Sequence, residues 1–560
     1  MHIERDEIVV DSVYGQNDSV GYIPGAYWDK RINAWRLPLS LQVIELVSKH
    51  HELSEDVMAE WMLLKSVKER MEKARSGEKV ASFDMPLKGV EPWDHQKRAH
   101  QMAMVSMLCG GGGFGLLFDM GTGKTMTAVG IAGSMYKIGK VKKVLVMAPS
   151  SVLPEWTKTL QRFADFEWTA EECTGSPKKR EQALQRLAEA DGCAFAVINY
   201  ESAWRTDAAI LKYKPDLVIC DESQRIKCHT AKQSKFAHKL AKVAPYRLIL
   251  SGTPLQNSPL DFFSQYLFLD RSVFGSKWYG FRERYSVQKT GYNSFTRREF
   301  KQVVGYRNLE ELTEKVHGIA LRVENGVIDL PAELPPVMRY AKLTPAERKV
   351  YDELRDESIA ELESGDTVVV ANALSKILRL QQVTSGFTVN DEGEEVNVGH
   401  AKADAFAELV DDVVVEQGEK LVVFFRFIKD MEAIEKVLKE KGIGYVTLYG
   451  GTKQAERKES VEAFASDPDV QVFVGQLQAS GTGIDGLQTS CHTACFYSNS
   501  YNAADYEQAK ARINRSGQKK SCVFIHLVCE DTVDEKILGA LKEKKNLSEL
   551  VVNQGIKNVL

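Results

Sequence analysis

The sequence has no apolar run near the ~18 residues that a membrane-spanning helix needs, and it has no internal repeat of solenoid period. It also lacks a strong excess of either charge, because the formal net charge is −4 over 560 residues. A nucleic-acid partner would therefore have to bind local basic clusters, since the chain as a whole is not a polycation. The hydrophobic content of 44% and the charged content of 27% are ordinary for a soluble globular protein.

The nine cysteines lack the paired spacing of a zinc site or a disulfide framework. Cys220, Cys228 and His229 lie close in the sequence, but no second pair of ligands completes a metal set. The N-terminal residues, MHIERDEIVV, do not have the charged and then apolar layout of a signal peptide. We therefore expect free thiols in a reducing cytoplasm, in a bacterial, archaeal or viral protein, or in the nucleus if the source is eukaryotic.

Two series of short apolar strands are present, with helical segments between the strands. The first series comprises 115–118, 144–148, 195–199, 217–220 and 247–250. The second comprises 421–426, 445–449, 470–475, 494–498 and 523–528. Near-continuous apolar strands of this kind are typical of parallel sheets that are buried on both faces. With helices between the strands, they predict an α/β fold with two lobes of similar plan.

Two other segments depart from this pattern. Residues 276–400 mix aromatic and charged residues at helical spacing, and residues 344–347 (TPAE) predict a helix start within them. Residues 21–40 predict a small hairpin that contains Trp28 and Trp35. The predicted domains are an N-terminal accessory module (1–80), a first lobe (88–275), helical protrusions with the inter-lobe linker (276–400) and a second lobe (401–560).

Residues 121–125 (GTGKT) follow an apolar strand and precede a helical run, which is the context that a phosphate-binding loop requires. Glycines allow backbone N–H groups to approach phosphates closely, and the helix N-terminus adds partial positive charge. Lys124 is predicted to reach the β- and γ-phosphates, and Thr125 to ligate Mg²⁺. The full motif has glycine six positions before the lysine, where this chain has Phe118.

Asp221 and Glu222 end the apolar strand DLVICDE, about a hundred residues after the phosphate-binding loop. Two adjacent carboxylates at the end of a buried strand can divide the work of hydrolysis. We expect Asp221 to hold Mg²⁺, directly or through water, and Glu222 to orient and deprotonate the attacking water.

These motifs, in this order, resemble a superfamily 2 helicase core of the Swi/Snf type over about residues 88–550. FDMGTGKT (118–125) resembles motif I, although Phe118 replaces the usual acidic residue, and Asp485 stands where the Swi/Snf pattern has Asn. The other motifs are 93–96 (WDHQ, the glutamine motif), 148–151 (APSS, motif Ia), 199–200 (NY, Ib), 221–224 (DESQ, the DExx box), 251–257 (SGTPLQN, III), 422–427 (VVFFRF, IV), 475–488 (GQLQASGTGIDGLQ, V) and 508–518 (QAKARINRSGQ, VI).

The resemblance implies two RecA-like lobes with ATP and Mg²⁺ between them. It implies that Arg515 and Arg512 reach ATP from the second lobe as arginine fingers, and that Gln96 reads the adenine edge. The residues it assigns to the nucleotide are Gln96, Met120, Gly121, Thr122, Gly123, Lys124, Thr125, Met126, Gly483, Asp485 and Arg515. The residues it assigns to the nucleic-acid backbone are Pro149, Ser150, Ser151, Tyr200, Gly450, Gly481 and Thr482.

The resemblance therefore implies a DNA-stimulated ATP hydrolase that moves on duplex or forked DNA, in a repair, replication or restriction complex and not at a membrane. A strand-separating DNA or RNA helicase and an NTP-gated nucleic-acid-binding switch are the alternatives. Residues 21–40 also resemble the HARP-type accessory element of annealing helicases. The alternative there is a small β module in which Trp28 and Trp35 are core residues.

Overall fold

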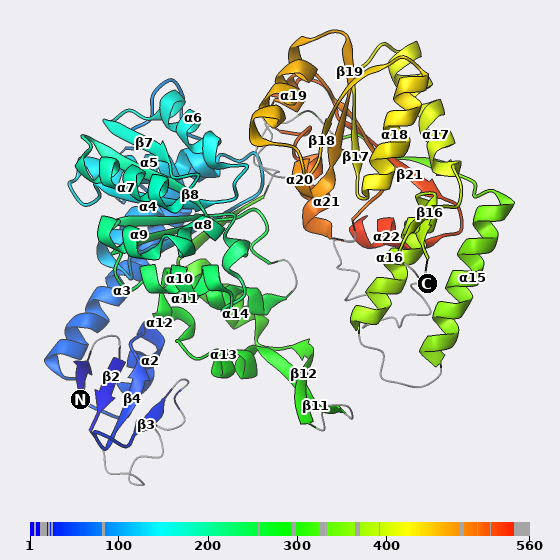
Figure 1. The fold of residues 1–560 in the computed structure, drawn as a ribbon. Helices are drawn as coiled ribbons and strands as arrows, with labels where there is room; N and C mark the ends of the chain where they lie inside the picture. Colours follow the sequence, from blue (N-terminus) through cyan, green and yellow to red (C-terminus); the bar gives the residue numbers. More distant parts are fainter. Residues whose placement is uncertain are drawn as a thin grey trace. The chain divides into compact units, whose positions relative to one another are not determined.

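A computed structural model describes residues 1–4, 7–11, 20, 23, 26–80, 84–255, 258–293, 298–324, 331, 333–363, 370–390, 393–480, 486–500, 502–515 and 517–542. The chain divides into two compact units, Met1–Asn325 and Gly326–Leu560 (Figure 1). No helix within these described ranges is both long and apolar enough to cross a membrane.

The first unit begins with a four-stranded antiparallel sheet of order β1-β2-β4-β3, followed by α2 (Leu41–Val47) and α3 (Glu55–Ser76). Its strands are β1 (His2–Glu4), β2 (Glu7–Val10), β3 (Tyr27–Asp29) and β4 (Ala34–Pro38). Trp28 and Trp35 lie directly opposite each other, with ring centroids 5.4 Å apart in an edge-to-face arrangement. The predicted hairpin is therefore confirmed, while its resemblance to a HARP-type element stays a prediction.

The main sheet of the first unit is parallel throughout, in the order β13-β5-β10-β9-β6-β8-β7. The strands are β5 (Gly113–Phe118), β6 (Lys143–Ala148), β7 (Trp168–Glu172), β8 (Cys193–Asn199), β9 (Leu217–Asp221), β10 (Tyr246–Leu250) and β13 (Ala320–Val323). Successive residues point to opposite faces, so that Leu116 joins one hydrophobic core and Leu117 the other.

Helices cover both faces of this sheet (Figure 1). One core is closed by α4 (Asp94–Cys109), α5 (Lys124–Lys137) and α6 (Leu153–Phe163). The other is closed by α7 (Pro177–Glu189), α8 (Tyr200–Arg205), α9 (Asp207–Tyr213), α10 (Lys232–Leu240), α11 (Phe262–Leu269), α13 (Trp278–Tyr285) and α14 (Leu309–Gly318).

The second unit holds a six-stranded parallel sheet in the order β14-β21-β20-β17-β19-β18. Its strands are β14 (Val337–Ala341), β17 (Leu421–Phe425), β18 (Gly444–Leu448), β19 (Val470–Gln476), β20 (Thr493–Phe496) and β21 (Val523–Cys529). One face packs against α17 (Ala401–Val410) and α18 (Ile428–Glu440). The other packs against α15 (Pro345–Glu363), α16 (Val370–Thr384), α19 (Gln454–Ser466), α20 (Leu477–Ser480), α21 (Ala503–Lys510) and α22 (Val533–Lys542).

The two predicted α/β lobes are confirmed, and all ten predicted strands are present within two residues of their expected bounds. Three further strands of these two parallel sheets were not predicted: β7, β13 and β14. Each lies at the edge of its sheet and contains exposed or half-buried residues, and β7 has no buried residue at all. Because an edge strand has only one neighbour, it needs no continuous apolar run, and the apolar pattern used for prediction misses it.

Residues 276–400 were predicted to form helical protrusions and the inter-lobe linker, but they also form strands. They contain a hairpin of β11 (Ser286–Asn293) and β12 (Arg298–Tyr306), the edge strands β13 and β14, and a short pair, β15 (Phe387–Val389) with β16 (Glu395–Asn397). The predicted helix start at 344–347 is confirmed by a capping box. The backbone N–H of Thr344 donates to Glu347 at 2.7 Å, and the N–H of Glu347 donates to the Thr344 hydroxyl at 3.3 Å.

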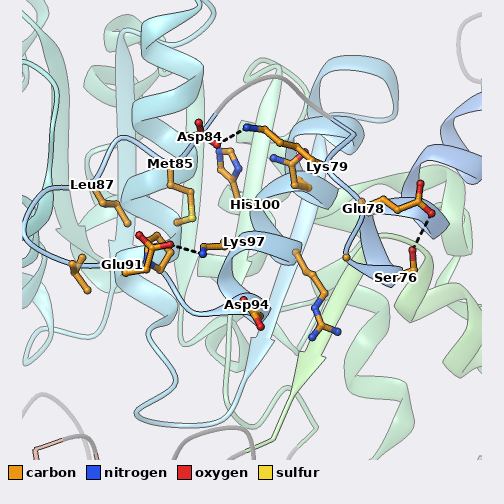
Figure 2. A pocket seen from close by; sticks show the side chains of 16 residues that line it. Ser76, Glu78, Lys79, Asp84, Met85, Leu87, Glu91, Asp94, Lys97 and His100 are labelled. Carbon is orange, nitrogen blue, oxygen red and sulfur yellow. Dashed lines mark hydrogen bonds and ion pairs between the residues drawn. The ribbon is translucent and has the colours of Figure 1, made fainter.

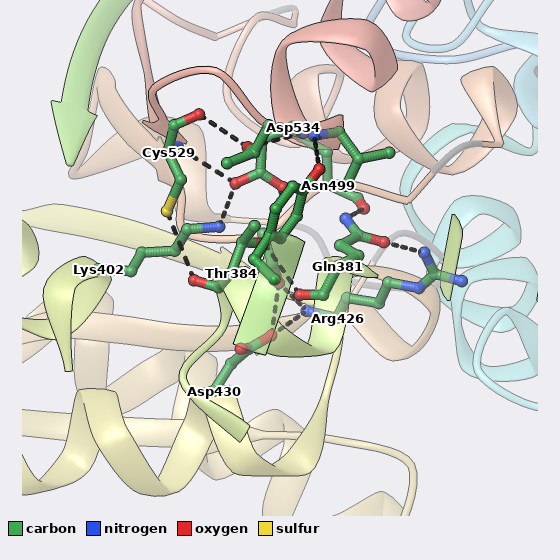
Figure 3. A network of polar contacts seen from close by, with 12 residues as sticks. Gln381, Thr384, Lys402, Arg426, Asp430, Asn499, Cys529 and Asp534 are labelled. Carbon is green, nitrogen blue, oxygen red and sulfur yellow. Dashed lines mark hydrogen bonds and ion pairs between the residues drawn. The ribbon is translucent and has the colours of Figure 1, made fainter. Parts of the chain in front are cut away.

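A buried polar network joins α16, α17 and α22 in the second unit (Figure 3). The Lys402 amine donates to the Asp534 carboxylate at 2.6 Å, with the two side chains 1% and 7% exposed. Thr384 donates to the same carboxylate at 3.0 Å. Burial lowers the pKa of Lys402, but the Asp534 carboxylate and the other acidic groups nearby together raise it above its usual value, so the Lys402 amine keeps its charge inside the core.

Candidate active site

The phosphate-binding loop lies between the carboxyl end of β5 and the first turn of α5. Gly121 and Gly123 both have left-handed backbones, with φ of 82° and 83°. This conformation suits glycine, and turns of this kind next to a helix N-terminus can form an anion-binding concavity. Thr122 fixes the turn from within, because its hydroxyl donates to the Asp119 carbonyl at 2.7 Å. Met120, Thr125 and Met126 are half-buried around the loop.

Lys124 points back across the loop in this structure. Its amine donates to the carbonyl of Phe118 at 2.9 Å and of Asp119 at 3.2 Å. The Phe118 ring is fully buried and packs edge-on against His95, with centroids 5.4 Å apart. Phe118 therefore contacts the loop through its main-chain carbonyl, while its ring packs away from Lys124 against His95. The absence of the motif's first glycine thus does not disturb the turn. A Cβ on Gly252 would lie 3.5 Å from the Lys124 amine, which brings motif III to the same point.

Asp221 is the last residue of β9 and is 3% exposed. One carboxylate oxygen accepts from the Trp156 indole N–H at 2.9 Å, and the other accepts from the Glu222 backbone N–H at 3.0 Å. Burial raises the pKa of Asp221, as does the Glu222 charge, while the Trp156 bond and the Lys124 charge lower it. Asp221 and Lys124 are therefore near enough to interact through their charges.

Glu222 has φ of 50°, a left-handed conformation that costs a non-glycine residue about 1–3 kcal/mol. Its carboxylate accepts from the Gln224 amide at 2.8 Å, and Gln224 in turn accepts from the Ser251 hydroxyl at 2.8 Å. Ser251 also accepts from the Thr253 backbone N–H at 3.1 Å. This chain of bonds connects the DExx box to motif III, so a displacement of either is transmitted to the other.

Arg322 is a site residue that the sequence did not reveal. It lies on the edge strand β13 and donates to the carbonyls of Leu117 at 3.1 Å and Gly252 at 3.0 Å. It also pairs with the Asp119 carboxylate at 2.5 Å across 203 residues of sequence. One guanidinium therefore joins the end of β5, the phosphate-binding loop and motif III. No local pattern around Arg322 could have shown these contacts.

Gln96 lies against the phosphate-binding loop and is fully buried. Its side-chain oxygen accepts from the Trp93 backbone N–H at 2.9 Å, which caps α4. Its amide donates to the carbonyls of Thr122 and Gly123, both at 3.5 Å. The structure thus shows Gln96 holding the loop to α4, and its reading of an adenine edge stays a prediction.

A pocket of about 610 Å³ lies on the other side of α4 (Figure 2). Asp94, Lys97 and Gln101 line it at helical spacing, whereas His95 and Gln96 turn to the loop. Ion pairs bridge its wall, Lys97 with Glu91 at 2.5 Å and Lys79 with Asp84 at 2.8 Å. The pocket is therefore separate from the phosphate-binding loop.

The nucleic-acid residues predicted in the first unit gather at the carboxyl ends of β6 and β8. Pro149, Ser150 and Ser151 follow β6, and the Asn199 amide donates to the Ser150 hydroxyl at 3.1 Å. The prediction for the Tyr200 side chain is wrong. Tyr200 is 2% exposed, and its hydroxyl donates to the Asp221 carbonyl at 2.7 Å, so it supports the DExx strand from inside the core.

In the second unit, Gly450 lies beside Gln476, the last residue of β19. The Gly450 backbone N–H donates to the Gln476 side chain at 3.0 Å, and the Gln476 amide donates to the Arg426 carbonyl at 3.3 Å. Gln476 thus joins motifs IV and V and was not singled out by the sequence. The predicted residues Gly481, Thr482, Gly483 and Asp485 lie outside the described residues.

Arg512 and Arg515 are half-buried in the turn that follows α21. Between them Ile513 is fully buried in the core of the unit, and on the same turn Lys510 pairs with Glu333 at 2.5 Å. Gln518 closes the turn by donating to the Cys491 carbonyl at 2.9 Å. The two arginines, three positions apart, therefore lie in a segment whose two ends are fixed by these contacts. Their contact with a nucleotide stays a prediction.

The donor set of the first unit fits Mg²⁺. The Thr125 hydroxyl and the Asp221 carboxylate are hard oxygen donors, which this cation prefers. Across the described part of the chain, no group of three or more His, Cys, Asp or Glu side chains could hold a metal by itself. That sparseness suits an ion whose remaining ligands are phosphate oxygens and water.

Two family models match this chain. The model of the SNF2-related domain matches residues 95–386, and that of the Helicase conserved C-terminal domain matches residues 401–517. A RAD54-like DNA repair and recombination protein of Danio rerio is 26% identical over 475 residues, which are 78% of this chain and 63% of that protein. The nuclear protein STH1/NPS1 of Saccharomyces cerevisiae is 26% identical over 474 residues, 79% of this chain and 33% of that protein.

The chain spans about 40% of the length of two curated mycoplasma relatives, each described as an uncharacterized ATP-dependent helicase. Among solved structures, a SWI2/SNF2 ATPase core of Sulfolobus solfataricus in complex with dsDNA aligns with 85% of this chain and 97% of that chain, at 22% identity and a TM-score of 0.38. The SNF2-related domain alone covers more than half of the sequence. The resemblance carried by the motifs is therefore confirmed, and the chain belongs to the SNF2-related family, with two RecA-like lobes.

Proposed function

We propose that this protein hydrolyses ATP and couples hydrolysis to movement along duplex or forked DNA. The observation that carries the proposal is the bonded chain from Glu222 through Gln224 to Ser251, next to a phosphate-binding loop that already has its anion-binding conformation. A site that only binds nucleotide needs no carboxylate held in a strained backbone, whereas a site that hydrolyses it needs a positioned base.

The chemistry assigned to the first unit follows from its contacts. Lys124 exchanges its two carbonyl partners for the β- and γ-phosphates when ATP binds. Glu222 accepts the proton of the attacking water, and the Gln224 amide keeps its carboxylate oriented. Mg²⁺, held by Thr125 and Asp221, would supply charge neutralisation between the phosphates.

Arg512 and Arg515 are assigned to the same nucleotide from the second unit. The charge that develops on the transferred phosphoryl group is stabilised by an arginine finger, which is worth roughly 10³–10⁵ in rate in other phosphoryl-transfer enzymes. The fixed turn after α21 supports this role, because a rigid support lowers the cost of positioning a long side chain.

DNA is proposed as the partner because the curated relatives with printed functions include RAD54-like DNA repair and recombination proteins. Backbone contacts by residues 149–151 and Gly450 would suit a motor that passes any sequence. A strand-separating helicase is the second candidate, because the insertion holds the β11–β12 hairpin, an element that can divide a duplex. A strand-displacement assay on forked DNA separates the two.

The test of the proposal is the ATPase rate of wild type and Glu222→Gln with no nucleic acid, single strand, duplex and fork. We expect strong stimulation by duplex or forked DNA. We expect Glu222→Gln to lower turnover by about 10²–10⁴-fold, the usual contribution of a general base, while binding of a fluorescent ATP analogue persists. Glu181→Gln, an exposed carboxylate on α7, is the matched control and should behave as wild type. Equal rates with every ligand, none included, would contradict the motor.

A further inference from the structure

The hairpin of β11 and β12 stands apart from the sheet of the first unit (Figure 1). Among the described strands it pairs with no third strand, and a two-stranded ribbon by itself is marginally stable in water. The exposed side chains near its base include Val287 and Val304, which are 44% and 48% exposed. Val303 packs against a core of the first unit, but these two valines remain exposed, so the ribbon is only partly covered.

The base of the ribbon is clamped by arginines. Arg282 donates to the Lys301 carbonyl at 2.5 Å, and Arg307 donates to the Glu283 carbonyl at 2.6 Å. Arg284 pairs with Glu311 of α14, which also accepts from the Tyr285 hydroxyl at 2.8 Å. These contacts fix α13 and the ribbon to α14. We define α13 together with the ribbon, residues 277–307, as the arm.

The arm carries a charge opposite to that of the chain. Its described residues include seven lysines and arginines against Glu283 and Glu299, a net charge of +5, whereas the whole chain has −4. Three of the arginines are used at the base. Lys289 and Lys301 are exposed. A concentrated positive charge of this kind is complementary to phosphates.

The strand register decides how the two lysines are placed. Lys289 lies opposite Gln302, and Thr290 lies opposite Lys301. Residues that lie opposite each other share a face, and neighbours along a strand point to opposite faces. Lys289 and Lys301 therefore project from the two different faces of the ribbon at nearly the same height. One flat surface could not contact both, but the two walls of a groove could.

We propose that the arm lies in a groove of duplex DNA, with Lys289 and Lys301 each bound to phosphates of a different strand. The major groove of B-DNA admits a two-stranded β-ribbon, so the dimensions fit. This inference rests on the proposed function for its partner, and it adds a DNA contact outside the helicase motifs. The arm would hold the duplex while the motifs at the ends of β6, β8 and β19 follow the backbone.

The test is the salt dependence of DNA binding, measured by fluorescence anisotropy on a duplex and on a single strand. Each phosphate contact adds about 0.9 to the slope of log K against log salt concentration on B-DNA. Lys289→Gln and Lys301→Gln should each lower the slope on duplex by about 0.9, and the double variant by about 1.8. A single strand has no groove, so we expect at most one of the two lysines to contribute to the slope on single-stranded DNA. Lys212→Gln, an exposed lysine on α9, is the control for lost charge and should keep the wild-type slope.

The possible outcomes are distinct. A double variant with the wild-type slope on duplex overturns the arm's role, as does an equal loss of slope on both DNA forms. A wild type that neither binds DNA nor hydrolyses ATP overturns the proposed function instead. The DNA-independent ATPase rate and the thermal unfolding curve of each variant should match wild type, because both lysines are exposed and lie outside the active site.

Discussion

Gly123 meets two separate constraints in one residue. Its φ of 83° disfavours any side chain, and a Cβ there would lie 2.1 Å from the Gln96 amide nitrogen. The glycine is therefore required by the contact that holds α4 to the loop as well as by the turn itself. The same contact explains why a residue of the glutamine motif, 27 positions away, is fully buried.

We predict that Gly123→Ala weakens ATP binding by at least tenfold, because the methyl group must displace Gln96 and with it the loop. Equilibrium binding of a fluorescent ATP analogue measures this. Gly139→Ala is the matched control: its φ is 71°, but nothing lies within 4 Å of the added methyl group. It should cost about 1–2 kcal/mol in stability and leave ATP affinity unchanged. Equal losses of ATP affinity in the two variants would show that backbone strain, and not the Gln96 contact, lowers the affinity.

At the scale of elements, the edge strand β13 has a function that its length of four residues does not suggest. It pairs with β5 and places Arg322 under the phosphate-binding loop. A helical protrusion expected at this position would have left Asp119 and Gly252 without this common partner. The strand is thus part of the edge of the first lobe that carries the predicted nucleotide site.

Arg322→Gln should lower the ATPase rate by about tenfold or more while the protein remains folded. The glutamine cannot span the loop carboxylate and the two carbonyls at once, so the loop and motif III lose their connection. Steady-state kinetics and circular dichroism test this together. Arg186→Gln, which removes only an exposed pair with Glu171, is the control, since surface pairs contribute about 0–1 kcal/mol. An Arg322→Gln enzyme with wild-type kinetics would contradict the assignment.

At the scale of the molecule, each unit has its own pair of hydrophobic cores around its own sheet. A chain of this kind need not unfold in one step, because each unit has cores of its own. The buried Lys402–Asp534 pair belongs to the second unit alone and offers a way to test this independence.

We predict that Lys402→Met destabilises the second unit by about 3–5 kcal/mol, because it leaves the Asp534 charge buried without its partner. The double variant Lys402→Met with Asp534→Asn should regain most of that loss, since no uncompensated charge remains. Differential scanning calorimetry should show one transition moved and another unchanged. A uniform shift of the whole profile in Lys402→Met would mean that the two units unfold together.

The sequence by itself determined the features that depend on local pattern. The ten predicted strands, the glycine turn at 121–125, the Asp221–Glu222 pair and the helix start at 344–347 are readable because their neighbours along the chain carry the signal. Each needs only a continuous apolar run, a glycine turn before a helix, or a capping residue.

The features that depend on contacts between residues far apart in the chain were decided only by the tertiary structure. It placed Arg322 under the loop, turned Tyr200 into the core, tied Gln96 to Gly123, and set Lys289 and Lys301 on opposite faces of a ribbon. The edge strands belong with these, because they owe their conformation to one neighbouring strand rather than to their own residues. The physical reason is the same in each case: burial and hydrogen bonding are properties of an environment that residues far apart in the chain assemble together.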